Sequence, residues 1–306
     1  MKVFIVGGTG FVGVSLANRL RALGEAVTVM GTGAARPAGL ERGVAVVTGD
    51  GRVPGPWQRE IPGHDAVVNL AGASIFQRWT PAAKIAIRES RLLTTRNVVD
   101  AIPAGAGVTL LSTSAVGYYG ARGDEELDEQ APPGADFLAD LCVAWEAEAR
   151  RAEAKGARVA ITRFGIVLGP GGGVLGQMVP LFRWFLGGPL GSGRQWFSWV
   201  HVEDVFRACL HLLARPGSAG AYNLTAPVPV TNREFARALG HALGRPSFLP
   251  APAAAVRLVL GEFAESVLTG QRVLPRRLLA EGFAFGFPRV DAALGAVLAR
   301  APKVPS

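Results

Sequence analysis

Short apolar runs alternate with segments of helical periodicity throughout the first half of the chain. Runs rich in Val, Ile and Leu predict strands over residues 3–7, 26–30, 44–50, 65–72, 107–114 and 157–169. Apolar residues that recur every three or four positions predict helices over residues 11–24, 81–102 and 135–156. Strands that are apolar on both faces and alternate with helices are typical of a parallel sheet covered on both sides. The pattern therefore predicts the α/β class, with a Rossmann-type doubly wound parallel sheet.

The pattern changes after residue 170. Helices are predicted over 202–216 and 232–246, a short strand at 221–225, and a helical tail with proline breaks. We therefore predict a sheet domain over 1–170 that also receives segments near 197–226. A smaller, mostly helical and discontinuous domain, expected to hold the substrate, would cover 171–306. His201 and Asp204 are expected to fix the join between the two.

Composition places the chain among globular proteins. It has 306 residues, of which 49% are hydrophobic and 18% charged. The formal net charge is +8, but only four of the 32 basic residues are Lys, and no run contains five or more basic residues. This scatter favours a compositional bias toward Arg over a polyanion-binding surface. We therefore expect no nucleic-acid partner.

Two cysteines, Cys142 and Cys209, lie in helical patterns without a C-x-x-C motif or a His at ligand spacing. This arrangement predicts reduced thiols, no metal site and a cytoplasmic location. The chain enters a strand directly, without the pattern of a signal peptide, and no apolar run approaches the ~18 residues of a membrane span. We therefore expect no membrane partner.

The stretch GGTGFVG at 7–13 follows the first strand and opens the first helix. Gly7 permits a positive φ in the turn, Gly10 lets the backbone approach a diphosphate, and Gly13 allows close packing of helix on strand. The amino end of the helix then offers oriented N–H groups to the anion. Because the motif heads a βαβ series, it predicts that the sheet domain binds a dinucleotide.

The end of the second strand bears on which dinucleotide binds. An acidic residue there would accept the ribose 2′-hydroxyl of NAD, but residues 27–37 read VTVMGTGAARP and contain none. Thr32 and Arg36 could meet a 2′-phosphate instead, so NADP(H) is favoured over NAD(H). The alternative for Arg36 is a solvated loop side chain.

Six motifs together resemble the extended short-chain dehydrogenase/reductase superfamily over nearly the whole chain. They are GGTGFVG at 7–13, NLAG at 69–72, STSAVGYYG at 112–120, TRFGIVLGPGGG at 162–173, FSWVHVEDV at 197–205 and YNLTAP at 222–227. NLAGASIFQRWT, GGPLGSGRQWFSWVHVEDV and the tail LTGQRVLPRRLLAEGFAFGF are most similar to the atypical, epimerase-like group that includes the bacterial YfcH proteins. The resemblance implies an NAD(P)-binding epimerase or oxidoreductase with a small-molecule substrate, and leaves open whether the chain forms a homodimer.

The resemblance also implies roles for single positions. The diphosphate would be lined by Gly7, Thr9, Gly10, Phe11, Val12 and Gly13. Asp50 resembles the acid that meets the adenine, and the two riboses would be bordered by Asn69, Leu70, Ala71 and Gly72. Ser112 and Ser114 lie where the strand delivers hydroxyls to the nicotinamide, and Ser114 occupies the catalytic Ser/Thr position. Arg194 and Gln195 lie where related sugar-nucleotide enzymes contact their substrate.

The acid/base pair of the superfamily is missing. Its Y-x-x-x-K motif puts a phenol and an ammonium one helical turn apart, and the ammonium lowers the phenol pKa. Here Leu138 stands at the Tyr position and Cys142 at the Lys position, and none of the three Tyr is followed by Lys four residues later. The atypical group shares this loss.

Several residues could substitute for the missing pair. Tyr118 or Tyr119 could supply a phenol near Ser114, although packing in the turn is the alternative role for both. Cys142 and Lys84 are weaker candidates. Arg78 and Trp79 lie on the loop that leaves the fourth strand, where ligands bind in such sheets, and could hold a substrate.

Two functions remain open from the sequence. One is an NADP(H)-dependent oxidoreductase or epimerase in which Ser114, with Tyr118, serves an atypical active site. The other is a dinucleotide-binding sensor or partner-binding module without turnover. The glycine motif supports both. The missing Tyr–Lys pair counts toward the second, but the first stays the leading interpretation and the second the alternative.

Overall fold

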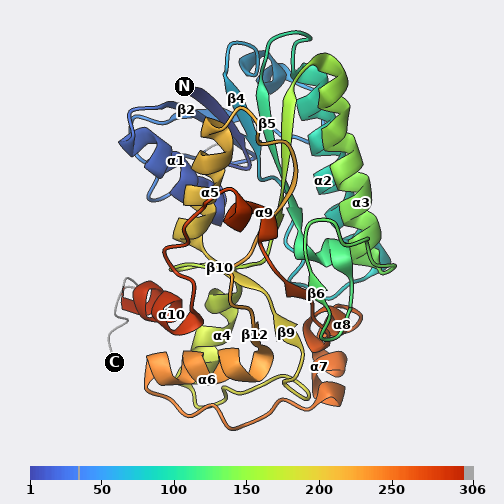
Figure 1. Ribbon diagram of the computed structural model, residues 1–306, viewed down its shortest axis with the longest axis vertical. Coiled ribbons are helices and arrows are strands. Elements are labelled where there is room, and N and C mark those ends of the chain that lie inside the picture. Colours follow the sequence, from blue (N-terminus) through green and yellow to red (C-terminus); the bar gives the residue numbers. More distant parts are fainter. Residues whose placement is uncertain (34, 300–306) are drawn as a thin grey trace.

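The central sheet of the computed structural model, which describes residues 1–33 and 35–299, has seven parallel strands (Figure 1). Its order is β11-β7-β5-β4-β1-β2-β3. The strands are β1 (Lys2–Val6), β2 (Ala26–Gly31), β3 (Ala45–Thr48), β4 (Ala66–Asn69), β5 (Thr109–Ala115), β7 (Arg158–Phe164) and β11 (Gly220–Leu224). All neighbouring pairs are parallel, so their carboxyl ends meet at one edge. The predicted fold class is confirmed.

Two layers of helices cover the sheet. Figure 1 shows α1 (Phe11–Ala22) and α5 (Val202–Ala214) on one face, and α2 (Pro81–Ala101) and α3 (Phe137–Arg150) on the other. The side chains of β1 alternate between the layers: Val3 and Ile5 join the core beneath α1 and α5, whereas Phe4 and Val6 join the opposite one. Burial on both faces explains why these strands read as continuous apolar runs.

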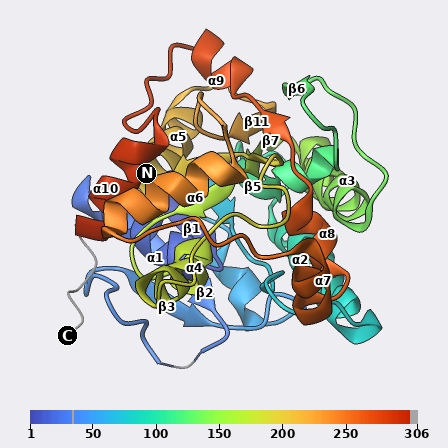
Figure 2. The same ribbon diagram turned by 90° about the horizontal axis from the view of Figure 1, so that it is seen from below.

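A smaller set of elements lies beyond the carboxyl edge of the sheet (Figures 1 and 2). Its helices are α4 (Gly173–Arg183), α6 (Asn232–Leu243), α7 (Ala253–Leu260), α8 (Phe263–Leu268) and α10 (Val290–Ala299). Helix α9 (Arg276–Ala280) instead packs beside β11 of the central sheet. Short strands pair as β8 (Ile166–Leu168) with β10 (Trp199–His201), β9 (Trp196–Phe197) with β12 (Val230–Thr231), and β6 (Glu126–Leu127) with β13 (Arg272–Val273). The division of the chain into domains at residue 170 stays a prediction.

The predicted strand over 157–169 is two strands. β7 belongs to the central sheet, but β8 pairs with β10. The break falls at Gly165, where an added β-carbon would lie 2.7 Å from the carbonyl oxygen of Ser198. A neighbouring backbone passes too close for a side chain, and the strand changes sheet at that point.

Asp204 and His201 contact the segment that follows α9. Asp204 is buried and its carboxylate accepts the N–H groups of Gly286, at 2.7 Å, and Phe287, at 2.9 Å. The ring of His201 lies 3.8 Å from the ring of Phe287, centroid to centroid. The two residues thus hold the segment between α9 and α10 in place.

Candidate functional site

The glycine turn after β1 is shaped by close approach of backbone to backbone. Gly7 has a φ of +75°, and an added β-carbon there would lie 2.9 Å from the Cα of Ala71. At Gly13 it would lie 2.5 Å from the carbonyl oxygen of Gly7. Both distances are too short for any side chain, so the turn is tight and α1 lies directly against it. The roles predicted for these two glycines match this geometry.

The amino end of α1 differs from those of α2, α3 and α6. Those three helices are capped by the side chains of Thr80, Asp136 and Thr231. The N-cap of α1 is Gly10, which supplies no side-chain hydrogen bond, and the first turn contains no acidic residue. In the described residues, no side-chain cap hydrogen bond is made at this end of the helix, so its N–H groups can receive an anion.

Phe11 follows the cap and packs against a second glycine-rich segment. Added β-carbons at Gly169 and Gly172 would lie 2.6 Å and 2.5 Å from carbons of its ring. These glycines precede α4, so the ring fills the space between the first helix and the start of the smaller set of elements. Thr9 and Val12, which were predicted beside it, lie on the same turn and are half-buried.

The NLAG segment lies beside the glycine turn, at the end of β4. The Asn69 side chain is buried, donates to the Thr95 hydroxyl at 2.9 Å and accepts the N–H of Ala71. Trp145 of α3 donates to the same hydroxyl at 2.8 Å. These hydrogen bonds hold Leu70, Ala71 and Gly72 against the glycine turn.

A dinucleotide fits the polar atoms at this edge of the sheet. Ser112 is paired with Asn69 across the strands, and its hydroxyl oxygen is buried without a partner among the described residues. The hydroxyl of Thr113 is buried and unpaired in the same way. Buried hydroxyls normally have a partner, and the oxygens of a bound ligand would supply one.

The residues expected at the adenosine end lie on the loops after β2 and β3. Thr32 is exposed. The Arg36 guanidinium donates to the backbone carbonyls of Leu40, Glu41 and Val44, so it closes its own loop. Asp50 accepts hydrogen bonds from Arg52, which lower the pKa of its carboxyl group. The adenosine contacts predicted for these three residues stay predictions.

Ser114 lies in a buried network at the end of β5. Its hydroxyl donates to Glu146 at 2.8 Å, and Glu146 forms a two-bond ion pair with Arg163 at 2.7 and 2.9 Å. Arg163 also donates to the Tyr119 hydroxyl, which donates to Asn223. The network fixes the rotamer of Ser114 through charges that are almost fully buried.

Glu146 and Arg163 were not anticipated from the sequence. Both lie in segments that read as apolar, VAITRFGIV and FLADLCVAWE. A charge inside a strand buried on both faces needs a partner of opposite sign, so Arg163 was itself a signal. Burial opposes its charge, but the hydrogen bonds to Glu146 and Tyr119 outweigh burial and raise the pKa of the guanidinium.

The two tyrosines after Ser114 differ in environment. Tyr119 is fully buried, and burial raises its pKa to about 12. Tyr118 is half-buried, and the Arg163 guanidinium lies 3.5 Å from its ring centroid. Of the two phenols, Tyr118 is therefore the one that a ligand could reach.

Helix α3 presents an apolar surface where the superfamily has its acid/base pair. Leu138 packs on Gly117, where an added β-carbon would lie 3.1 Å from the Cβ of Leu138. Cys142 is buried, and burial raises the pKa of its thiol to about 11. Neither residue can exchange a proton readily at neutral pH.

The predicted substrate residues are spread over several loops. The indole of Trp79 is buried against Phe137 and Phe263. Arg78 is exposed and lies against Gly261.

The second pair of predicted substrate residues precedes β9. Arg194 is exposed. Gln195 donates to the carbonyls of Leu190 and Val267, and its own amide oxygen is buried without a partner in the described part of the chain. The contacts of both pairs with substrate stay predictions. Lys84, the weaker candidate, pairs with Glu262.

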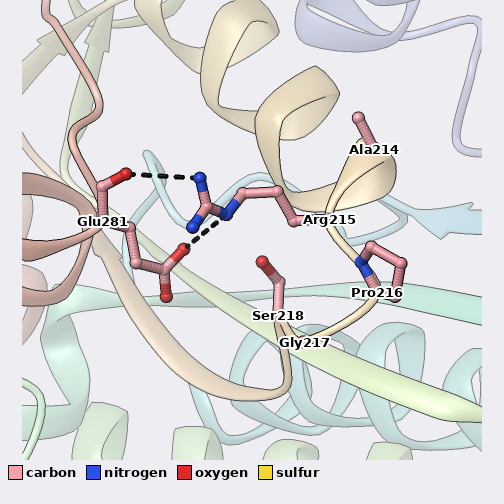
Figure 3. Close-up of a pocket in the computed structure, with 6 residues that line it drawn as sticks. All are labelled: Ala214, Arg215, Pro216, Gly217, Ser218 and Glu281. Atoms are coloured by element: carbon pink, nitrogen blue, oxygen red, sulfur yellow. Dashed lines mark hydrogen bonds and ion pairs between the residues drawn. The ribbon is translucent and has the colours of Figure 1, made fainter.

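An open depression of about 400 Å³ lies elsewhere on the molecule (Figure 3). It is lined by Ala214, Arg215, Pro216, Gly217, Ser218 and Glu281. Figure 3 shows Arg215 reaching toward Glu281, whose carboxylate lies 3.6 Å from it. Because α5 ends and β11 begins here, the depression lies at the amino edge of the sheet, opposite the glycine turn.

Two expected absences concern metals and membranes. Within residues 1–33 and 35–299, no cluster of three or more His, Cys, Asp or Glu side chains could hold a metal ion. Over the same ranges, no helix has both the length and the apolar character that crossing a membrane requires.

Comparison with protein families covers most of the chain. Residues 3–225 match the NAD dependent epimerase/dehydratase family, and residues 251–297 match a domain of unknown function, DUF1731. A protein of Arabidopsis thaliana called epimerase family protein SDR39U1 homolog, chloroplastic, is 43% identical over 97% of this chain and 87% of its own. An epimerase family protein of Mycobacterium tuberculosis is 44% identical over 96% of each chain.

A solved structure is similar over the same length. The crystal structure of human epimerase family protein SDR39U1 (isoform 2) with NADPH superposes with a TM-score of 0.86 at 36% identity. The match covers 98% of this chain and 100% of the human one.

The buried thiols predict a pH dependence of stability. Burial raises the pKa of Cys142 to about 11 and that of Cys209 to about 12, above the ordinary value of 9.0. Below pH 9 the thiols are protonated in both states. At higher pH only the unfolded thiols ionise, so stability is lost as the pH rises from about 9 toward 11.

The expected loss is at most about 1.4 kcal/mol per thiol for each pH unit. Urea unfolding at pH 8 and pH 10 measures it. The double variant Cys142→Ala/Cys209→Ala should show a smaller decline than the wild type. Equal declines would mean that these thiols are not protonated in the folded protein.

Proposed function

This chain belongs to the NAD-dependent epimerase/dehydratase family, and on that premise we propose that it binds NADP(H) and acts on a small molecule as an oxidoreductase or epimerase. The substrate-side chemistry would be carried by an atypical site at the end of β5. A cytoplasmic location is part of the proposal, supported by two buried, unpaired thiols. A homodimer is a further part of the proposal.

One observation carries the binding proposal: the amino end of α1 is preceded by a glycine turn and has no side-chain cap. The N–H groups of its first turn would hold the diphosphate, with Gly7 and Gly13 keeping the backbone close. The segment Asn69–Gly72 and the hydroxyl of Ser112 would border the nicotinamide half. When bound, the cofactor supplies or accepts a hydride.

The preference for NADP(H) is supported by the loop after β2. Residues 32–37, directly after the strand, include no carboxylate that would accept a 2′-hydroxyl, and Thr32 at the end of the strand is exposed. The human relative that was solved with NADPH is similar over the full length of this chain. Arg36 would meet the 2′-phosphate by giving up carbonyl bonds within its own loop.

Two residues would perform the substrate chemistry. Ser114 is held by Glu146, and its oxygen lone pairs would accept a hydrogen bond from a substrate hydroxyl. Tyr118 is the half-buried phenol and would exchange the proton with the substrate oxygen. Tyr119 supports it from beneath, with ring centroids 5.2 Å apart.

One observation favours the second function, a dinucleotide-binding sensor without turnover. Leu138 and Cys142 fill the positions of the acid/base pair with apolar and protonated groups, and the Ser114 hydroxyl proton is committed to Glu146. Such a protein would bind the dinucleotide and change shape without chemistry.

Substituting Gly10→Asp separates binding from folding. Aspartate is a favoured N-cap, so the melting temperature should stay unchanged or rise slightly. Its carboxylate would occupy the anion site and repel a diphosphate, so NADPH affinity should fall about 100-fold or more. Fluorescence titration of NADPH and thermal unfolding measure the two effects.

The control for Gly10→Asp is Gly217→Asp, at the amino edge of the sheet. A β-carbon at Gly217 meets no atom within 4 Å, so the variant should fold and bind like the wild type. Unchanged NADPH affinity in Gly10→Asp would rule out the proposed diphosphate site.

Substituting Thr32→Asp tests the cofactor preference. A carboxylate at this exposed position would repel the 2′-phosphate, so NADPH affinity should fall roughly tenfold or more while NADH affinity holds or rises. Thr269→Asp adds the same charge at an exposed position just after α8 and should alter neither the NADPH affinity nor the NADH affinity. Equal losses of NADPH affinity and NADH affinity would mean that the 2′-phosphate does not bind beside Thr32.

Substituting Tyr118→Phe tests the proton donor. The ring and its contact with Arg163 are kept, so NADPH affinity should not change, whereas turnover should fall about 10²-fold or more. NADPH oxidation is followed against a panel of aldehydes, ketones and sugar nucleotides. Tyr222→Phe, which removes a hydroxyl bonded to Glu281 at the opposite edge, is the control. A wild type that binds NADPH but consumes none across the panel would support the sensor.

A further inference from the structure

We propose that Arg91 is the cationic residue at the nicotinamide half of the dinucleotide site, in place of the ammonium that the sequence lacks. The inference rests on the proposed function, since it assigns a residue to the same binding site. Its ligand is the nicotinamide riboside moiety, recognised through hydroxyl groups by a fixed positive charge.

Helix α2 places Arg91 at the edge of the sheet formed by the carboxyl ends of its strands. Thr95 of α2 accepts a hydrogen bond from Asn69, the last residue of β4. Arg91 lies four residues nearer the start of the same helix, about 6 Å along its axis and on the same face. The helix returns from the carboxyl end of β4, so this turn places the guanidinium just beyond the strand ends, where ligands bind in such sheets.

Backbone contacts fix the Arg91 side chain against the NLAG segment. One terminal nitrogen donates to the carbonyls of Ala73, at 3.1 Å, and Ile87, at 3.0 Å. A β-carbon at Gly72 would lie 3.0 Å from the central carbon of the guanidinium. The adjacent Ser90 hydroxyl accepts the N–H of Ala73. The guanidinium therefore forms part of the wall beside Gly72.

The charge of Arg91 lacks a counter-charge in the part of the chain that the structure describes. No carboxylate there forms an ion pair with it, and its other donors, the Nε and the second terminal nitrogen, have no protein acceptor within the same residues. Burial lowers the pKa of the guanidinium. A half-buried cation without a counter-charge is costly, and ligand oxygens would offset that cost.

Position, contacts and charge together distinguish Arg91 from the other cations nearby. Arg163 is neutralised by Glu146, and Lys84 pairs with Glu262. Arg91 instead lies over the ring of Trp145 of α3, 5.2 Å from the ring centroid. Trp145 lies about one helical turn from Cys142, the residue at the position of the missing Lys. The cation has thus moved from α3 to α2, while its place beside the strand ends is kept.

A positive charge beside the nicotinamide would change the relative affinities for the oxidised and reduced cofactor, whereas a purely structural role of Arg91 would not. The nicotinamide ring is cationic when oxidised and neutral when reduced. A fixed guanidinium beside it disfavours the oxidised form, so the wild type should bind NADPH more tightly than NADP⁺. Adenosine 2′,5′-bisphosphate lacks the nicotinamide half and should not sense Arg91 at all.

The test compares Arg91→Met and Arg91→Lys with Arg88→Met, an exposed arginine on the outer face of α2. Dissociation constants for NADPH, NADP⁺ and adenosine 2′,5′-bisphosphate are measured by titration calorimetry. Arg91→Met should weaken NADPH binding about tenfold and reduce the preference for NADPH over NADP⁺ at least about threefold, because the repulsion of the oxidised ring is removed. Binding of adenosine 2′,5′-bisphosphate should stay within about twofold, as should all three ligands in Arg88→Met.

Arg91→Lys keeps the charge and loses the planar fork. It should retain the preference for NADPH over NADP⁺ while losing NADPH affinity, which keeps the proposal testable if Arg91→Met unfolds. Equal losses for NADPH and adenosine 2′,5′-bisphosphate, or an unchanged preference in Arg91→Met, would overturn the role of Arg91 and leave the proposed function standing. A wild type that binds neither nucleotide would overturn both.

Discussion

The ion pair between Glu146 and Arg163 is the interaction on which the rest of the site depends. It joins α3 to β7 inside the protein, with both side chains almost fully buried. Removing one partner of such a pair typically costs about 3–5 kcal/mol, because the other charge is left buried and unpaired. Ser114, Tyr118 and Tyr119 all contact one member of the pair. The end of β5 is thus held by electrostatics, whereas the Y-x-x-x-K motif would place a phenol and an ammonium there.

This arrangement changes how the missing Tyr–Lys pair is understood. Its two positions have become part of the packing between α3 and the turn after β5, through Leu138 and Cys142. Polar groups remain on three sides of that packing, from β5, from the turn and from α2. The loss of the motif therefore removes the polar side chains from one surface of α3. Charged and hydroxyl groups from the neighbouring elements still surround that surface.

The sequence predicted the features that depend on local pattern. Periodicity and glycine spacing were sufficient for the sheet, its covering helices and the turn at Gly7, because each is governed by neighbours along the chain. The break at Gly165 was missed, since its cause is the backbone of Ser198, a contact made only by folding. The two-residue strands were missed because so short a segment has no period. Glu146 and Arg91 were missed for a related reason: a charge on a helix usually faces solvent, and only the tertiary structure shows that these two face inward.

The packing of Phe11 on Gly169 and Gly172 has a mechanical consequence. The ring belongs to the first turn of α1, and the glycines lead into α4, so the two helices share one contact surface with no slack for a methyl group. A ligand that tilts α4 must displace the ring, and with it the amides at the start of α1. Occupancy of the helix terminus and the position of α4 would then be coupled, and by reciprocity each would affect the other by the same free energy.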